Sequence, residues 1–404
     1  MFTKKGVKSM FNEKMLGLGK QSSAIRELFE YGKIRKKEIG EDNVFDFSIG
    51  NPNVKTPDFV NEKLIEIIKN TDPVSLHGYT SASGNMKTRD AIASYLNKTY
   101  GCNEQGKYIY LTLGAAASLS IAFNALLNEG DEVIVFTPFW PEYKVLAEQA
   151  KGKMVMVNPD EKFYPDFIDF ENKITNKTKI VIINSPNNPT GVIYDESVIK
   201  KIASIMDAKQ KEYGHNIYLF SDEPYRELVY NNEKYPFVTN YYDNSLIAYS
   251  FSKSLSLPGE RVGYLLVSSK MNNKDDVFAC ICGSGRSLGF VCASSLFQEL
   301  IPHVLGITSD LSVYKENREL LYDALVSLGY DVIYPSGAFY MFVKALEEDD
   351  EAFSNVAKQE ELLLVPSVSF GIKGYVRISY CVSSKTIKDS LPAFKRLMNR
   401  YKGE

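Results

Sequence analysis

Residues 108–136 read YIYLTLGAAASLSIAFNALLNEGDEVIVF, and this stretch decides the fold class. Its first six residues predict a strand, Gly114 ends that strand, and the mostly small and apolar residues 115–127 predict a helix. A second apolar run follows at 132–136. Apolar strands joined through a helix are typical of a parallel sheet that is covered on both faces. The stretch therefore predicts a strand–helix–strand unit of an α/β domain.

The same alternation continues along the middle of the chain, and the pattern changes after about residue 305. Further strands are predicted at 179–183, 217–220 and 246–250, with helices at 141–150 and 196–212. The last hundred residues predict helices at 310–328 and 384–401, and strands at 340–343, 362–365 and 375–379. We expect a large α/β domain over residues 55–305, with a mostly parallel sheet sandwiched by helices. A smaller α+β domain would combine residues 306–404 with the N-terminal segment 1–54.

The composition is that of an ordinary globular protein. The chain has 404 residues, of which 44% are hydrophobic and 24% are charged. Its net charge of −3 provides no basic field for nucleic acid or for an anionic membrane. The longest mostly apolar stretch, 115–127, is too short to span a bilayer, and residues 1–20 lack the apolar core of a signal peptide. We therefore expect a cytoplasmic protein with no membrane or nucleic-acid partner.

Cysteine and histidine do not indicate a metal site. The five cysteines form no Cys-x-x-Cys pair, so neither a disulfide framework nor a zinc site is predicted. We expect them to be small buried residues in a reducing compartment. His77, His215 and His303 are too scattered along the chain for a metal triad.

Ligands of open α/β sheets bind beyond the carboxyl ends of the strands, so the residues after each predicted strand are candidate site residues. After the strand at 108–113, Ala115 and Ala116 begin a helix whose free backbone N–H groups suit an anion, although a small-residue helix start is also common as plain structure. After 132–136 comes Trp140, the only tryptophan, between two prolines. Trp140 either packs in the core or offers a flat face for ring stacking.

Two further strand ends carry polar side chains. The segment NSPNNPTG at 184–191 is rich in turn formers, and its Asn188 is also a candidate for a fixed hydrogen-bond donor. The segment SDEPY at 221–225 places Asp222 at a strand end. This carboxylate either caps a helix or holds a proton on a heteroaromatic nitrogen.

The strongest candidate follows the strand at 246–250, where the segment SFSK ends at Lys253. A lysine at a buried strand end is costly unless the amine is used, and a desolvated amine is the standard group for Schiff-base chemistry. Ser250, Ser252 and Arg261 in the same segment can complete a phosphate cup.

Taken together and in this order, these motifs resemble the fold type I, class I/II aminotransferases, which use pyridoxal 5'-phosphate (PLP). The resemblance rests on Asn188-Pro-Thr-Gly191, Asp222-x-x-Tyr225 and Ser-x-Ser-Lys253 with Arg261 eight residues on. It runs from about Phe47 to Arg377. It implies an enzyme that moves an amino group between an α-amino acid and an α-keto acid through a PLP–lysine Schiff base.

The resemblance also implies roles around the cofactor. Lys253 would form the Schiff base and then shuttle a proton, and Asp222 would keep the pyridine nitrogen protonated. Asn188 and Tyr225 would bind the ring oxygen, and Trp140 would stack on the ring face. The phosphate would be held by the backbone of Ala115 and Ala116 and by Ser250, Ser252 and Arg261.

Three more residues are implied by the resemblance. Tyr79, in HGYT, matches a tyrosine that reaches the phosphate of the neighbouring subunit, which implies a homodimer with shared active sites. Gly50, in SIGNP, would approach the substrate carboxylate through its backbone. Arg377, in GYVRIS, would pair with the substrate α-carboxylate as a planar fork; from the residues alone, a surface arginine on an edge strand is the alternative.

The sequence departs from the family pattern in places. Ala115 stands after Gly114 where many relatives have a hydroxyl, so the phosphate cup would depend on backbone donors, the two serines and Arg261. Arg286 lies in a glycine-rich segment, 283–289, of the kind that lines the substrate mouth. It either binds a side-chain carboxylate of the substrate or is a solvated residue.

Other functions use the same motifs. A PLP-dependent C–S β-lyase or related elimination enzyme would share them, because they define the electron sink and not the bond that breaks next. A PLP-binding transcription regulator would need a DNA-binding module, and the remaining segment of about 45 N-terminal residues has no helix-turn-helix pattern. A metabolite-binding or structural α/β protein is the third alternative. The amino donor stays open, since Trp140 and the many tyrosines and phenylalanines suit aromatic substrates or core packing equally.

Overall fold

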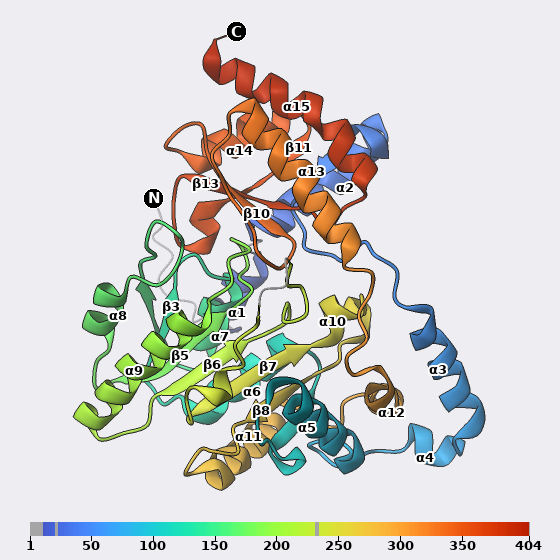
Figure 1. The fold of residues 1–404 in the computed structure, drawn as a ribbon, viewed down its shortest axis with the longest axis vertical. Helices are drawn as coiled ribbons and strands as arrows, with labels where there is room; N and C mark the ends of the chain where they lie inside the picture. The colour runs from blue at the N-terminus through green and yellow to red at the C-terminus, as the bar shows by residue number, and fades with distance from the viewer. Residues whose placement is uncertain (1–10, 21–22, 231–233, 404) are drawn as a thin grey trace, which may run out of the picture.

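The computed structural model describes residues 11–20, 23–230 and 234–403. Within these ranges, seven strands form a central sheet in the order β2-β8-β7-β6-β5-β3-β4, and only β8 runs antiparallel to its neighbours (Figure 1). The strands are β2 (Ile109–Thr112), β3 (Glu132–Phe136), β4 (Lys153–Val157), β5 (Thr178–Asn184), β6 (Tyr218–Asp222), β7 (Ser245–Ser250) and β8 (Gly263–Val267). The predicted α/β class with a mostly parallel sheet is confirmed.

Helices cover both faces of this sheet (Figure 1). Alternate residues of β3 and β5 enter different cores: Ile134 and Val181 pack with α5, α8, α9 and α12, whereas Val133 and Ile180 pack with α6, α7 and α11. These helices are α5 (Met86–Tyr100), α6 (Ala115–Leu126), α7 (Glu142–Gln149), α8 (Phe167–Lys173), α9 (Glu196–Tyr213), α11 (Lys274–Leu288) and α12 (Ser295–Val304). Two further helices, α3 (Asp58–Asn70) and α4 (Pro73–His77), extend along one side, and the short α10 (Phe251–Ser254) follows β7.

A second, antiparallel sheet with the order β12-β13-β10-β9 lies in the C-terminal part of the chain. Its strands are β9 (Val332–Ile333), β10 (Tyr340–Lys344), β12 (Val365–Pro366) and β13 (Tyr375–Ser379). It is packed with α13 (Ser312–Leu328), α14 (Asp350–Gln359) and α15 (Ser384–Lys402). The N-terminal segment joins this part, because β1 (Phe45–Asp46) pairs in parallel with β11 (Leu362–Leu363) and α2 (Ala24–Ile39) contacts β11 and β12. The boundaries at 55 and 305 stay a prediction.

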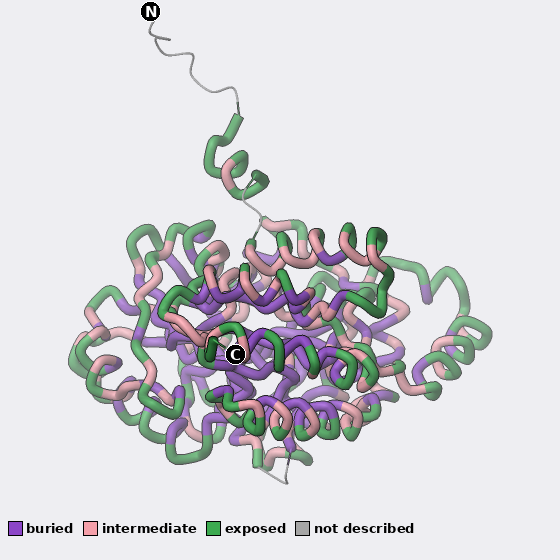
Figure 2. Tube along the Cα trace, turned by 90° about the horizontal axis from the view of Figure 1, so that it is seen from above, coloured by how far each residue is buried: buried purple, intermediate pink, exposed green. Residues whose placement is uncertain are grey.

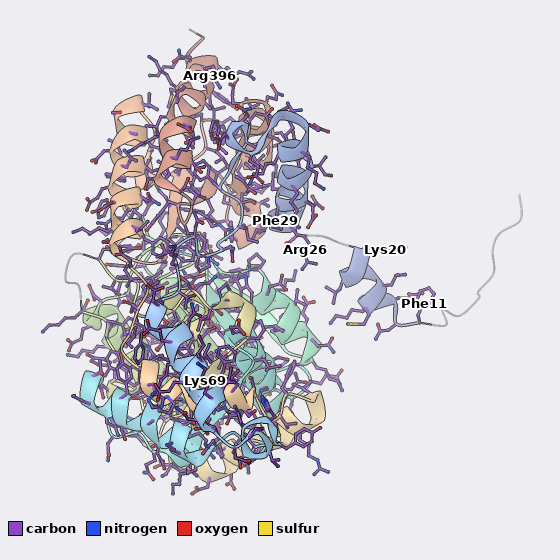
Figure 3. The ribbon with its side chains drawn as sticks, turned by 90° about the vertical axis from the view of Figure 1, so that its right-hand side faces the viewer. Phe11, Lys20, Arg26, Phe29, Lys69 and Arg396 are labelled. Carbon is purple, nitrogen blue, oxygen red and sulfur yellow. The ribbon has the colours of Figure 1, made fainter. Side chains whose placement is uncertain are left out.

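Short 3₁₀ turns complete the described elements: η1 (Glu41–Asn43), η2 (Gly106–Tyr108), η3 (Val238–Asn240), η4 (Pro258–Glu260) and η5 (Ser367–Phe370). Buried residues concentrate in the middle of the molecule (Figure 2). Helix α1 (Glu13–Lys20) has no buried residue and projects from the body (Figure 3). Among the described residues, no helix is both long and apolar enough to cross a membrane.

The structure differs from the sequence-based expectations in three details. Strands β1, β4, β8 and β9 were not predicted, and the strand expected at 362–365 is divided into β11 and β12. The glycine-rich segment 283–289 lies mostly in the last turns of α11. The expectation that the cysteines are buried is wrong for four of them: all five are free thiols, Cys280 is exposed, and only Cys381 is fully buried.

Candidate active site

A cavity of about 290 Å³ lies at the carboxyl edge of the central sheet, where β5, β6 and β7 end side by side. Parallel strands end at the same edge, and the residues that follow them therefore meet there. Residues of β10 and β13 close the cavity from the C-terminal sheet. Every site residue predicted from the sequence lines this cavity except Tyr79: Gly50, Ala115, Ala116, Trp140, Asn188, Asp222, Tyr225, Ser250, Ser252, Lys253, Arg261 and Arg377.

Lys253 enters the cavity from α10, the short helix that follows β7. Its amine donates a hydrogen bond to the Gly50 carbonyl at 2.7 Å. Burial lowers the pKa of Lys253 to about 8, because the desolvated ammonium is disfavoured. No described carboxylate forms an ion pair with it. The amine is therefore partly neutral near physiological pH and is available as a nucleophile or base.

Asp222 is the last residue of β6 and is only 4% exposed. The Tyr143 hydroxyl donates to its Oδ2 at 2.5 Å, while Oδ1 is buried without a hydrogen-bond partner in the described chain. Burial raises the pKa of Asp222 to about 7. A buried carboxylate oxygen that faces a cavity without a partner fits a cationic or protonated-nitrogen ligand.

An anion site surrounds Gly114 at the start of α6. Helix α6 begins at Ala115 without a side-chain cap, so its first backbone N–H groups are free. Gly114 has a φ of +93°, and a Cβ there would lie 3.1 Å from Arg261 Nη2 and 3.4 Å from Ser250 Oγ. The Ser250 and Ser252 hydroxyls are 2.7 Å apart. Backbone donors, two hydroxyls and a guanidinium thus converge as a phosphate site requires.

Arg377 lies on β13, is only 2% exposed and forms no ion pair with any described carboxylate. Its Nη1 donates to Asn188 Oδ1 at 3.0 Å, its Nη2 donates to the Ser48 carbonyl, and its Nε is buried without a partner. A buried guanidinium that lacks an anion is costly, so this group fits a carboxylate ligand. The alternative of a surface arginine is wrong, because β13 is paired on both sides.

The charge balance of the cavity favours an anionic ligand. Lys253, Arg261 and Arg377 line it, whereas Asp222 is the only carboxyl group among the described lining residues. Burial further disfavours the charged form of Asp222. A ligand with a phosphate and a carboxylate would compensate these cations.

Aromatic side chains form the remaining walls. The Tyr225 and Tyr340 hydroxyls are 2.9 Å apart. A Cβ at Gly50 would lie only 2.0 Å from the Tyr340 hydroxyl, so this position requires glycine. Trp140 contacts the Tyr143 ring edge-to-face, with centroids 5.5 Å apart and an interplanar angle of 89°.

Sequence reasoning missed several residues of the site. Tyr143 carried a signal, because it stands three residues after Trp140 and shares its segment. Tyr340 and Ser48 carried none, since their contacts with Tyr225 and Arg377 join distant parts of the chain. Asn184, at the end of β5, donates to the Asp222 carbonyl at 2.8 Å.

Two candidates lie outside the cavity of their own chain. Tyr79 follows α4, and its side chain is 99% exposed. Arg286 is an exposed residue near the end of α11 and does not line the cavity. Its interpretation as a solvated residue therefore holds within one chain.

Comparisons with known proteins agree with this geometry. Residues 42–394 match the family model "Aminotransferase class I and II". The chain is 31% identical to an aspartate aminotransferase of Thermotoga maritima, over 89% of this chain and 92% of that protein. A probable aspartate aminotransferase of Methanocaldococcus jannaschii is 30% identical over 93% and 96%. A crystal structure of an amino transferase from Eubacterium rectale is 52% identical, with a TM-score of 0.96 over 98% of this chain and 100% of that one.

The chain belongs to the class I and II aminotransferases. It is therefore a transaminase, an enzyme that acts on small-molecule amino and keto acid substrates.

Proposed function

We propose that this enzyme transfers amino groups with PLP bound in the cavity and with Lys253 as the Schiff-base lysine. The observation that carries the proposal is the shared position of three groups. One cavity contains the Lys253 amine, the unpartnered Oδ1 of Asp222 and the anion site around Gly114. PLP supplies, when it is bound, a protonated ring that withdraws negative charge from the substrate Cα.

The residues around the ring each have a defined task. The free Oδ1 of Asp222 would accept a hydrogen bond from the protonated ring nitrogen, while the Tyr143 hydroxyl donates to Oδ2. Asn188 uses its amide oxygen for Arg377, which leaves its amide nitrogen to donate to the ring oxygen together with the Tyr225 hydroxyl. Trp140 offers its face to the ring. The phosphate is held by Ser250, Ser252, Arg261 and the N–H groups of Ala115 and Ala116.

Arg377 and Lys253 act on the substrate. The Arg377 guanidinium binds the α-carboxylate through a bidentate, charge-assisted contact, beside the Gly50 backbone. The Lys253 amine would take the proton from the substrate Cα and carry it to the cofactor carbon that bears the transferred nitrogen. Its pKa of about 8 suits both halves of this transfer.

We further propose a homodimer in which Tyr79 reaches the phosphate site of the partner subunit. The exposure of Tyr79 supports this proposal, because the side chain is not buried by the described residues of its own chain and is free to reach another subunit. Other large apolar side chains are exposed on the neighbouring elements α3, α4 and α5: Phe59, Ile65, Ile68, Val74 and Met86. The five free thiols support a reducing, cytoplasmic location.

The direct test is to purify the protein with PLP, reduce it with borohydride and map the modified lysine by mass spectrometry. We expect the adduct on Lys253. Amino acids should discharge the absorbance band of the unreduced enzyme and yield keto acids with intact carbon skeletons. Ammonia and a shortened product would instead indicate elimination, and an adduct on another lysine would contradict the assignment of Lys253.

A further inference from the structure

We infer that the preferred amino donor has an uncharged, apolar side chain, which is a statement about the substrate class and rests on the proposed function. Once the proposed roles are assigned, the apolar side chains that remain in the lining without a role are Ile25, Ile49, Pro224 and Pro258. An apolar subsite at the mouth of a charged cavity selects the substrate by its side chain.

The polar groups of the cavity are already engaged. Lys253 is proposed to form the Schiff base with the cofactor, Arg261 to bind its phosphate and Arg377 to bind the substrate α-carboxylate. Asn184 is consumed by its neighbours, since its amide nitrogen donates to the Asp222 carbonyl and its oxygen accepts from the Asn188 N–H at 2.8 Å. No further cation in the described lining could bind a second substrate carboxylate.

The two isoleucines come from the N-terminal segment. Ile49 immediately precedes Gly50, whose carbonyl accepts the hydrogen bond from Lys253, and it is 37% exposed. Ile25 lies in the first turn of α2 and packs against the core of the central sheet. Both line the same cavity as the Lys253 amine.

Arg26, the cation next to Ile25 in the sequence, does not add a positive charge to the lining. Arg26 is exposed and does not line the cavity. Figure 3 shows it at the start of α2, where the chain arrives from α1. A carboxylate placed against Ile25 and Ile49 would lose water without gaining an ion pair, and this cost is large for a charged group.

Residues 291–292 lie beside the Tyr79 loop and would accompany it into a partner subunit. Cys292 ties them to the Tyr79 loop, because the Cys292 N–H donates to the Ala82 carbonyl at 3.1 Å and its thiol to the Thr80 carbonyl at 3.3 Å. The residue before Cys292 is the exposed Val291. If the Tyr79 loop enters the cavity of a partner subunit, this segment would accompany it and bring the apolar Val291.

L-leucine and L-aspartate test the inference as a matched pair, because both branch at Cγ and differ in charge. The PLP-loaded enzyme is mixed with each amino acid without a keto acid, and loss of the absorbance band gives kcat/KM for the half-reaction. We expect leucine to exceed aspartate by roughly tenfold or more. Equal or faster reaction of aspartate would overturn the inference while leaving transamination intact. If the enzyme reacts with none of the amino acids tested, the proposed function itself is overturned.

Variants then assign the selectivity to the subsite. Ile25→Arg should raise the aspartate-to-leucine ratio by about tenfold or more, because it adds a cation to the lining. Ile25→Gln controls for polarity without charge and should change the ratio much less. Ile34→Arg is the matched control on the same helix, since Ile34 is 60% exposed and outside the lining, and it should leave the ratio unchanged. An equal response of Ile25→Arg and Ile34→Arg, or a selective loss of aspartate reaction in Arg26→Gln, would overturn the inference.

Discussion

Arg377 donates a hydrogen bond from Nη1 to Asn188 Oδ1 at 3.0 Å, across a sequence separation of 189 residues. The contact joins the C-terminal sheet, which carries Arg377, to the loop after β5, which carries Asn188. In the proposed function the first residue binds the substrate carboxylate and the second binds the ring oxygen of the cofactor. A substrate that draws the guanidinium toward itself would therefore also change the hydrogen bonding of the ring.

Replacement of Arg377 tests the substrate side of this pair. Arg377→Lys keeps the charge but loses the planar fork and the bond to Asn188, so KM for the amino acid should rise about 10- to 100-fold, as expected for a charge-assisted contact of roughly 1.5–3 kcal/mol. Steady-state kinetics with several amino acids measure the change.

Arg318→Lys is the matched control for Arg377→Lys. Arg318 is equally buried, and its guanidinium lies 4.7 Å and 4.8 Å from the Tyr230 and Tyr334 ring centroids, outside the cavity. We expect this control to lower the free energy of unfolding and to leave KM unchanged. A wild-type KM in Arg377→Lys would remove Arg377 from substrate binding.

Lys253 should account for both the catalytic and the spectroscopic properties of the enzyme. Lys253→Ala should lose turnover by several orders of magnitude, because the covalent anchor and the proton carrier are removed together. Lys270→Ala, which removes a lysine that donates to the Thr239 carbonyl outside the cavity, should retain wild-type turnover. In the cofactor-free protein, labelling of Lys253 by an amine-reactive reagent should increase through pH of about 8. Normal turnover of Lys253→Ala would contradict this mechanism.

Much of this architecture is predictable from local patterns. Strands β3, β5, β6 and β7 are continuous apolar runs that end in polar or turn-forming residues, and their predicted positions agree with the structure to within one or two residues. Strand β4 was missed because it lies at the sheet edge, where Lys153 and Met156 are exposed and the apolar run is interrupted. Strand β8 was missed because it follows a short turn and not a helix.

Some residues of the site are likewise predictable from local motifs, and others are not. Residues within one motif, such as Asp222 and Tyr225, were found because their spacing is itself the signal. Tyr340 belongs to the C-terminal sheet and contacts Tyr225 only through tertiary packing, so no local sequence spacing predicts this contact. Ile25 resembles any apolar residue of an amphipathic helix until the fold places it in the cavity.

Tyr143 should tune the ionisation of Asp222. The hydrogen bond from the Tyr143 hydroxyl lowers the pKa of Asp222 and partly offsets the effect of burial. Tyr143→Phe removes this bond, so the Asp222 pKa should rise and the carboxylate should form only at higher pH. The acid limb of kcat/KM should therefore move to higher pH in this variant.

Tyr330→Phe controls for the loss of a buried hydroxyl. Tyr330 donates to the Phe394 carbonyl at 2.8 Å in the C-terminal core, away from the cavity. The pH profile of this variant should match that of the wild type. If the acid limb of Tyr143→Phe also stays in place, Tyr143 has no electrostatic role toward Asp222.

A buried ion pair next to the site should dominate local stability. Arg226 Nη2 lies 2.5 Å from Glu223 Oε2, both side chains are almost completely buried, and the guanidinium carbon is 4.4 Å from the Tyr249 ring centroid. Arg226→Met leaves the Glu223 carboxylate buried and unpaired, so the free energy of unfolding should fall by about 3–5 kcal/mol. Urea unfolding measures the loss. The double variant Glu223→Gln/Arg226→Met should recover part of it, and a further decrease would contradict the pairing.

Shared active sites in a homodimer can be tested by mixing two inactive variants. In a C2 dimer whose sites combine Lys253 of one subunit with Tyr79 of the other, a hybrid of Lys253→Ala with Tyr79→Ala contains one site with both residues intact and one site with neither. Random reassembly of equal amounts should therefore restore about a quarter of the wild-type sites. Each variant mixed with itself provides the control, and Val326→Ala, which alters an exposed residue on α13, should behave as wild type. If the mixture is no more active than the two variants alone, Tyr79 does not act across the interface.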